Sequence, residues 1–268
     1  MKGLARGRPW CLVGAVALGA LGCDGGTTKT MGSHTPFAGC LAKPTAPPAG
    51  LGLVPFYVKY LDGHGTPVVS SERVSDEALL RACRITGNMV SLREDVRQAM
   101  AGNNHRVAVL AMTERVTDLP ENEDLYTAFP NTDWNTYRAV SATRVRPVTS
   151  ISEENLLCLS GDMYPGDSAL VHVLAHSMRD LGILEVDPQF GSQLQTAYAS
   201  AMAQGLWANT SATKDADAYW AVGGLAWFGV GARLPVKSRA DLADYDAPLA
   251  ALLAAYLPLN DWHPSCYP

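Results

Sequence analysis

Short apolar runs rich in β-branched and aromatic residues dominate the first part of the chain. One run covers residues 53–61 and another covers residues 67–69, and the glycine-containing segment 62–65 lies between them. This arrangement predicts a strand, a turn and a second strand. A third run, over residues 105–112, predicts a short buried strand.

Apolar residues spaced three and four positions apart predict helices in the rest of the chain. The first follows the capping residue Ser75, and its apolar face comprises Ala78, Leu79, Ala82, Ile85 and Met89. The polar segment 113–152 contains three prolines and is expected to be irregular. Later helices are expected over residues 169–181, 190–206, 215–228 and 247–257. This order predicts an α+β fold with a mixed N-terminal part and a helical C-terminal part.

The N-terminus has the pattern of an export signal. Basic residues precede an apolar run over residues 10–21, which is too short to span a bilayer and suits a cleaved signal of residues 1–22. The run ends in small residues before Cys23, as in bacterial lipoprotein signals, so we expect Cys23 to carry a lipid. The alternative is an ordinary secretory signal in which Cys23 has no such role.

The mature chain is expected to consist of a tether and one domain. Residues 23–50 are rich in Gly, Thr, Pro and Ala, and such a segment buries too little apolar surface to fold alone. Residues 51–268 are long enough for one domain with a sizeable core. We therefore expect an exported protein whose N-terminal lipid anchors it to a membrane of the bacterial cell envelope.

Four cysteines remain once the signal cysteine and Cys23 are set aside. In an oxidising compartment an even number predicts two disulfides, with three pairings open among Cys40, Cys83, Cys158 and Cys266. A thiol metal site would need close C-x-x-C pairs, which the sequence lacks. The net charge of −5, without a basic block, gives no reason to expect nucleic acid as a partner.

His172 and His176 are the main chemical signal. They lie four residues apart in a predicted helix, so both imidazoles lie on one face and can bind one metal ion. Without further context the pair would be interpreted as two core or surface histidines, because this spacing also arises by chance.

Other segments of the chain provide that context. In order along the chain these are FYVKY (56–60), VSDEALL (74–80), TDLPE (117–121), EENLLC (153–158), GLW (205–207), YWAVG (219–223), WF (227–228) and YD (245–246). Together they resemble a family of secreted, zincin-like neutral zinc metallopeptidases, whose members carry an H-E-x-x-H helix and a downstream Y-W-A-E-G helix. The resemblance implies a zincin-like metallopeptidase fold for residues 51–268.

The resemblance also implies roles for the positions at which this chain differs. In such enzymes two His and a downstream Glu bind Zn²⁺, and the Glu after the first His activates water as a general base. Here Val173 and Val222 stand at the two Glu positions, and Ser211 stands where the family tends to have Tyr. Valine takes no proton, so loss of the base costs a factor of about 10² to 10⁴ in rate. Two His ligands alone predict weak binding of zinc.

Carboxylates elsewhere are candidates for the missing groups. Asp215 lies two helical turns before the downstream valine and is the candidate substitute ligand, whereas Asp217 is closer but is expected to point away. Asp162 and Asp167 flank the start of a helix, where carboxylates more often stabilise the N-terminus than bind metal. His263 has no spacing that favours a ligand, so we expect a surface position.

Two further sets of residues are expected to be structural. The acidic residues Glu114, Asp118 and Glu121 match an E-x-x-T-D-x-P-E stretch of the family, and ordering of the long loop is favoured over lining a cleft. Three tryptophans with apolar neighbours on helical segments are expected in the core rather than stacked on a ligand. They are Trp207, Trp220 and Trp227.

The residues leave three functions open. The first is an inactive metallopeptidase homologue that acts at the cell envelope as a binding module for a peptide or protein in the former substrate cleft. The second is an active zinc metallopeptidase with a non-standard base and ligand, supplied by Asp215 or a loop carboxylate. The third is a lipoprotein that holds a transition metal at His172 and His176 without hydrolysis.

Overall fold

The computed structural model describes residues 38–264. The predicted signal over residues 1–22, the predicted lipid site Cys23, and Cys266 lie outside the described residues. Within residues 38–264, no helix is long and apolar enough to cross a membrane.

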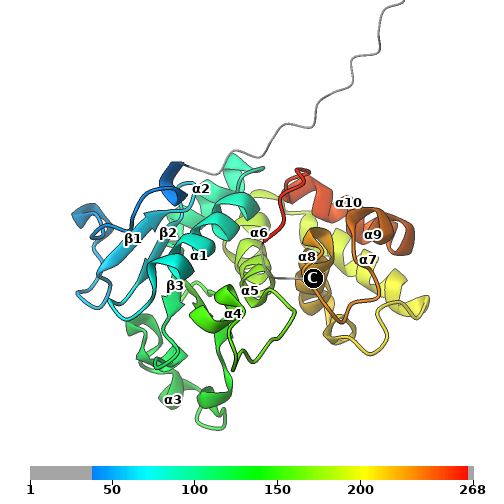
Figure 1. The fold of residues 1–268 in the computed structure, drawn as a ribbon. Helices are drawn as coiled ribbons and strands as arrows, with labels where there is room; N and C mark the ends of the chain where they lie inside the picture. The colour runs from blue at the N-terminus through cyan, green and yellow to red at the C-terminus, as the bar shows by residue number, and fades with distance from the viewer. Residues whose placement is uncertain (1–37, 265–268) are drawn as a thin grey trace, which may run out of the picture. The chain divides into compact units, whose positions relative to one another are not determined.

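Five strands of the described chain form one mixed sheet in the order β1-β2-β3-β5-β4 (Figure 1). Strands β2, β3 and β5 are parallel, whereas β1 and β4 at the two edges are antiparallel to their neighbours. The strands are β1 Lys59–Asp62, β2 Pro67–Ser70, β3 Arg106–Leu110, β4 Ala139–Val140 and β5 Val148–Ser152.

Helices lie between the strands and make up most of the chain after β5, which confirms the predicted α+β class (Figure 1). The earlier helices are α1 Asp76–Met89, α2 Glu94–Gly102, α3 Leu125–Ala128 and α4 Glu153–Leu157. The later helices are α5 Ala169–Met178, α6 Leu184–Val186, α7 Phe190–Ala203, α8 Ala216–Phe228, α9 Arg239–Tyr245 and α10 Ala247–Tyr256. A π-helical segment, Arg179–Ile183, joins α5 to α6.

The sheet separates two hydrophobic cores, because alternate residues of a strand point to opposite faces. Val68 and Val107 belong to the larger core, which also contains the buried faces of α1, α5 and α8. Their neighbours Val69 and Ala108 belong to a smaller core on the other face, which is covered by irregular chain around Trp134.

Helix α1 follows its prediction closely. The Ser75 side chain accepts a hydrogen bond from the Ala78 backbone N–H at 3.3 Å, which caps the helix. All of the predicted apolar-face residues are buried, including Leu79 and Met89. The helices expected at 169–181, 190–206, 215–228 and 247–257 correspond to α5, α7, α8 and α10.

Two predictions about extended structure are wrong. The strand expected over residues 53–61 begins only at Lys59, because the chain turns at Pro55 and the Tyr57 N–H donates to the Val54 carbonyl. The segment 113–152, expected to be irregular, contains β4 and all of β5. Small polar residues alternate with Val and Ile in β5, which hid its strand pattern.

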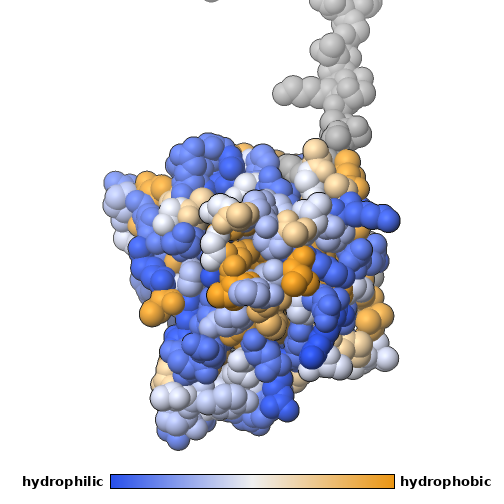
Figure 2. Space-filling model, turned by 90° about the vertical axis from the view of Figure 1, so that its left-hand side faces the viewer, coloured by the Kyte–Doolittle hydropathy of each residue, from blue (hydrophilic) through white to orange (hydrophobic). Residues whose placement is uncertain are grey.

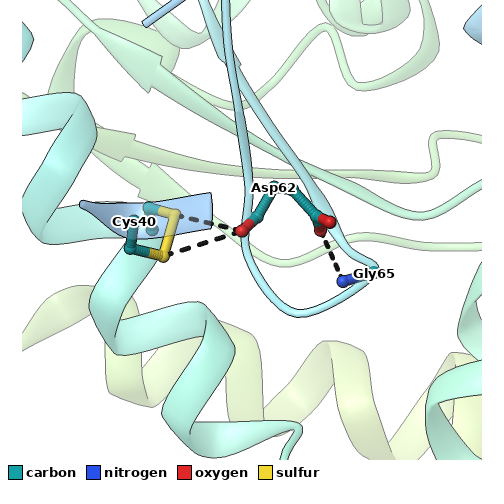
Figure 3. The surroundings of a disulfide bond; sticks show 4 residues. Cys40, Asp62 and Gly65 are labelled. Carbon is teal, nitrogen blue, oxygen red and sulfur yellow. Dashed lines mark hydrogen bonds between the residues drawn. A yellow bond between two sulfur atoms is a disulfide. The ribbon is translucent and has the colours of Figure 1, made fainter. Parts of the chain in front are cut away.

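The described fold also includes residues before 51, within the predicted tether. Cys40 is fully buried and forms a disulfide with Cys83 of α1, and both sulfur atoms lie against the Asp62 carbonyl oxygen (Figure 3). A side chain at Gly39 would meet that oxygen at 2.2 Å, so only glycine permits this approach. Thr45 then pairs with β1 through the backbone of Tyr60. Residues 38–50 are therefore part of the folded domain.

The face shown in Figure 2 carries hydrophobic residues in several separate areas among hydrophilic ones. Scattered apolar residues of this kind are normal on protein surfaces. This face therefore gives no argument for a docking surface.

Candidate functional site

Helix α5 carries the two histidines, and the residues before it fix where the helix starts. The Ala169 N–H donates to the Asn155 side chain at 3.0 Å, so an amide of α4 caps α5. Asp162 accepts from the Asn155 amide, and Asp167 accepts from the Ala232 N–H at 2.8 Å. Both carboxylates order the loop before α5, and neither caps the helix as expected.

His172 and His176 lie next to each other on α5, with their Nε2 atoms 3.3 Å apart. The Nδ1 atom of His176 lies 2.8 Å from the Asp217 carboxylate of α8. Arg179 approaches the same carboxylate oxygen at 3.3 Å and also pairs with Asp180. The histidines therefore end a chain of polar contacts that joins α5 to α8.

The environment lowers the pKa of both His172 and Asp217, so both groups favour their deprotonated forms near pH 7. Burial, and then the neighbouring His176, lower the pKa of His172 to about 4, so this imidazole is neutral near pH 7. Burial acts to raise the pKa of Asp217, but the hydrogen bond from His176 and the nearby positive charges outweigh it, and the pKa is lowered. An ionised Asp217 favours the tautomer of His176 that carries its hydrogen on Nδ1, which leaves Nε2 facing His172.

The histidines open into a pocket of about 570 Å³. The α5 wall consists of His172, Val173 and His176, and Leu225 of α8 contributes to the same pocket. Val173 is 8% exposed, so the position of the predicted general base carries an apolar side chain at the pocket surface.

The rest of the pocket lining comes largely from the edge strand and from loop residues. Strand β4 contributes Ala139 and Val140, and aromatic side chains extend the wall. These aromatic residues are Trp134, Tyr137 and Tyr164. Ser211 and Lys214, which are both exposed, complete the rim on the side of α8.

Two polar contacts at Arg138 hold the start of β4 in place. Its guanidinium pairs with Glu154 at 2.6 Å, where both side chains are almost inaccessible to solvent. Its backbone N–H donates to the Tyr164 hydroxyl at 3.3 Å. The edge strand is therefore fixed to α4 and to the loop before α5.

Val222, at the position of the predicted third ligand, is 2% exposed and belongs to the larger core. Helix α8 packs closely on α5 there, since a side chain at Gly224 would lie 3.3 Å from the Ala175 methyl group. The Trp220 indole donates to the Ala175 carbonyl at 2.9 Å across the same interface. Position 222 is thus a packing position between helices.

The structure distinguishes the two aspartates at the start of α8. Asp215 is the N-cap of the helix, and its side chain accepts from the Ala218 N–H at 2.7 Å. Asp217, expected to point away, is the residue that contacts His176. The reason is that α8 crosses α5 with its first turn beside His176, an arrangement that spacing within one helix cannot show.

The remaining acidic candidates stabilise the loop after β3. Glu114 accepts hydrogen bonds from the Ser71 hydroxyl at 2.6 Å and from the Ala111 N–H at 2.8 Å. Asp118 accepts from the Arg115 N–H, and Glu121 accepts from the Tyr57 hydroxyl at 2.6 Å. These contacts agree with the structural role expected for the three acidic residues.

The tryptophans and the last histidine lie where they were expected. Trp207, Trp220 and Trp227 are 0 to 4% exposed, and each indole N–H donates to a protein acceptor. His263 is exposed, and its Nε2 atom lies 3.3 Å from the Gly229 carbonyl oxygen.

A zinc ion of the kind that the family resemblance implies would need a third protein donor beside the two histidines. Among residues 38–264, no group of three or more His, Cys, Asp or Glu side chains is arranged to hold a metal ion. The nearest carboxylate, Asp217, contacts Nδ1 of His176, on the opposite side of the ring from the gap between the histidines. The donor set therefore does not fit a three-ligand zinc site.

Sequence reasoning missed the contact of Asp217 and the aromatic wall of the pocket. The aromatic residues Trp134 and Tyr137 occur in the segment that was expected to be irregular, and long irregular segments are often functional. Their place in a long irregular segment was the sequence signal that could have indicated this part of the pocket. The contact of Asp217 has no sequence signal, because it depends on the crossing of two helices.

Comparison with known proteins adds a distant structural similarity. No protein-family model matches the sequence, and a search of curated proteins finds no match. Among solved structures, the chain is similar to the Pro-Pro endopeptidase PPEP-2 from Paenibacillus alvei, with a TM-score of 0.44 and 13% sequence identity. The match covers 65% of this chain and 89% of that chain. A similarity of this size supports no argument about activity.

Proposed function

We propose that this protein is a peptide-binding module with a metallopeptidase-like domain and no hydrolytic activity. The observation that carries the proposal is Val173, which lies between His172 and His176 in sequence and lines the same pocket. Hydrolysis of a peptide at this place would need a group that takes a proton from water, and the valine side chain cannot do so.

The pocket wall formed by β4 favours an extended polypeptide as the occupant. This strand is last in the sheet order, so among the described residues its outer side pairs with no strand. An extended peptide can add to such an edge through backbone hydrogen bonds, while adjacent pockets select its side chains. The aromatic residues beside β4 offer apolar surface for those side chains.

The location we propose is the bacterial cell envelope, with a lipid on Cys23. A Cys23→Ser protein should then move from the membrane fraction to the soluble fraction of the cell. Membrane association that persists in this variant would contradict the lipid anchor and would leave the proposed peptide-binding role intact.

A second candidate is a transition-metal site without hydrolysis at His172 and His176. Two nitrogens 3.3 Å apart can both lie at about 2.0 Å from one ion at a roughly tetrahedral angle. Asp217 contacts Nδ1 of His176, and metal-binding histidines are commonly oriented by a carboxylate at the ring nitrogen that does not bind the metal. The third candidate, an active enzyme with Asp215 as ligand, has less support because Asp215 caps α8.

The experiment that tests the proposal measures metal content and peptidase activity of the tag-free mature protein. We expect little bound zinc and no cleavage of a peptide library. Val222→Glu should raise zinc affinity by about tenfold or more, because it adds a carboxylate donor, without conferring turnover. Val222→Gln is the matched control, since it has a similar size and is a weaker ligand.

The double variant Val173→Glu/Val222→Glu tests the loss of the base directly. It should show detectable hydrolysis, provided that circular dichroism confirms that a carboxylate at the buried position 222 is tolerated. One zinc per chain together with peptide cleavage in the unmodified protein, both lost on His172→Ala, would overturn the proposal. Stoichiometric metal without cleavage would instead favour the second candidate.

A further inference from the structure

A series of buried hydrogen bonds runs from His105, the residue before β3, to the pocket. His105 Nε2 lies 2.8 Å from the Thr149 hydroxyl, which lies 2.7 Å from the Ser177 hydroxyl. Ser177 donates to the Val173 carbonyl at 2.8 Å and accepts from the Ala142 backbone N–H at 2.9 Å. These contacts join His105 to β5, to α5 and to Ala142, the residue after the β4 wall.

The hydrogen-bonded side chains of this series lie in the interior, away from solvent. The Thr149 and Ser177 side chains are fully buried, and His105 is 3% exposed. Thr149 belongs to β5, opposite Val107 of β3 in the parallel ladder. Its hydroxyl therefore lies between the sheet and α5, where a polar group without a partner would be costly.

One direction of donation satisfies every contact in the series. If His105 carries its hydrogen on Nε2, the imidazole donates to Thr149, Thr149 donates to Ser177, and Ser177 donates to the Val173 carbonyl. The other tautomer would leave a buried N–H on Nδ1, for which no partner lies among the described residues. It would also turn the Ser177 hydroxyl away from Val173, because Ser177 would then have to donate to Thr149. A buried donor without a partner is rarer than a buried acceptor without one.

The end of this series connects the two walls of the pocket. Ala142 directly follows the β4 wall residues 139–141, and Val173 belongs to the α5 wall. One hydroxyl, that of Ser177, contacts the backbone of both walls. Strand β4 pairs with β5 over only two residues, so this contact attaches its end as the Arg138 contacts attach its start.

We propose that Ser177 is a positioning residue that fixes the separation of the β4 and α5 walls, and that His105, as the Nε2–H tautomer, orients its hydroxyl through Thr149. The proposal concerns the shape of the pocket and holds whatever the pocket binds. It assigns to a buried histidine, outside the metal-like pair, a role in shaping the site.

The tautomer can be measured in the unmodified protein by NMR with ¹⁵N-labelled histidine. The signal of His105, assigned from its loss in His105→Gln, should show a protonated Nε2 and an unprotonated Nδ1 at pH 7. A protonated Nδ1 with a bare Nε2 would overturn the proposed direction. The tautomer itself is measured in the unmodified protein, and a variant is needed only to assign the signal. Thr149→Val should alter the same signal and so provides a second assignment.

Two substitutions test the two parts of this hydrogen-bond series one at a time. Ser177→Ala should increase the hydrogen-exchange rate of the Ala142 amide by about tenfold, because it removes the acceptor. Thr149→Val should allow a mixture of His105 tautomers and leave Ala142 exchange within about twofold, because it also removes the acceptor that competes with the Val173 carbonyl for the Ser177 hydroxyl, and Ser177 keeps both wall contacts. Ser192→Ala, a serine on the exposed face of α7, is the control and should change neither signal.

A crystal structure of Ser177→Ala should show a longer distance between Val140 and Val173. Ser177→Thr, which restores the hydroxyl, should return Ala142 exchange toward that of the unmodified protein. If Ser177→Ala and Ser192→Ala give the same Ala142 exchange rate, or if the walls do not move, the positioning role is wrong. If Ser177→Ala does not fold, two measurements still decide the proposal. They are the exchange rate of the Ala142 amide in Ser177→Thr, which should match that of the unmodified protein, and the tautomer of His105.

Discussion

His105 and His263 show how strongly the surroundings of one residue type determine its chemistry. His263 is exposed, whereas His105 is 3% exposed beside β3. Burial, and then the positive charge of Arg106, lower the pKa of His105 to about 3. The folded protein therefore keeps this imidazole neutral at pH values where the unfolded chain binds a proton.

This difference predicts a pH dependence of stability. An unfolded histidine has a pKa of about 6.5, so between about pH 6.5 and pH 3 the unfolded state binds one more proton at residue 105. The contribution of His105 is fully present above pH 6.5 and is lost as the pH falls, by about 1.4 kcal/mol per pH unit at most. Urea unfolding between pH 7 and pH 4 measures it.

The matched variants are His105→Gln and His263→Gln. His105→Gln should reduce the slope of unfolding free energy against pH in this window, and His263→Gln, at an exposed position, is the control for replacing a histidine. Part of the slope should remain in His105→Gln, because the pKa of His172 is also lowered. Equal slopes in the two variants would show that His105 is protonated in the folded state.

At the scale of elements, Asp246 joins α10 to α8 and to the turn between α7 and α8 that carries Trp207. Its side chain accepts from the Leu249 N–H at 3.2 Å and so caps α10. It also accepts from the Tyr219 hydroxyl of α8 at 2.7 Å and from the Trp207 indole at 2.8 Å. Burial, and then the hydrogen bond to Asp246, raise the pKa of the Tyr219 hydroxyl, so this hydroxyl remains a donor.

Asp246→Ala should therefore destabilise the protein by about 3 kcal/mol or more, because it removes a helix cap and leaves two buried donors without their acceptor. The measurement is the free energy of unfolding in urea. Asp244→Ala, an exposed neighbour in α9, is the control and should stay within about 0.5 kcal/mol of the unmodified protein. Similar values for the two variants would show that the contacts of Asp246 contribute little.

At the scale of the whole described chain, the Cys40–Cys83 disulfide ties its first residues to α1 across 43 positions of sequence. Both cysteines are fully buried, and the carbonyl oxygen of Asp62, the last residue of β1, lies against them (Figure 3). Cys158 is disulfide-bonded as well. If the four cysteines of the mature chain pair among themselves, Cys266 is the partner that remains for Cys158.

Loss of the first disulfide should destabilise the domain by about 4 kcal/mol, the loop-closure value for 43 residues. The measurement compares urea unfolding of Cys40→Ser/Cys83→Ser with that of the unmodified protein. Thiol titration of the denatured, unreduced mature chain should find no free thiol, and peptide mapping should link Cys158 to Cys266. Two or more thiols per chain would contradict the prediction of two disulfides.

Periodicity and capping chemistry were sufficient to predict α1, α5, α7, α8 and α10, because helix spacing and end signals are local. The same reasoning failed for β5, whose residues Val148–Ser152 are all buried. Its small polar residues are partnered by other segments, as Thr149 is by Ser177. In the sequence a polar residue of a strand resembles a loop residue, because the partner of its side chain lies in a distant segment.

The sequence by itself determined the α+β class and the histidine pair on one helix face. These follow from residue identity and spacing within one element. Only the tertiary structure decided that Asp217 rather than Asp215 reaches His176, that Val173 lines the pocket while Val222 lies in the core, and that Ser177 links the pocket walls. Each of these depends on how helices cross one another or approach the sheet, and such contacts between distant segments leave no periodic trace in the chain.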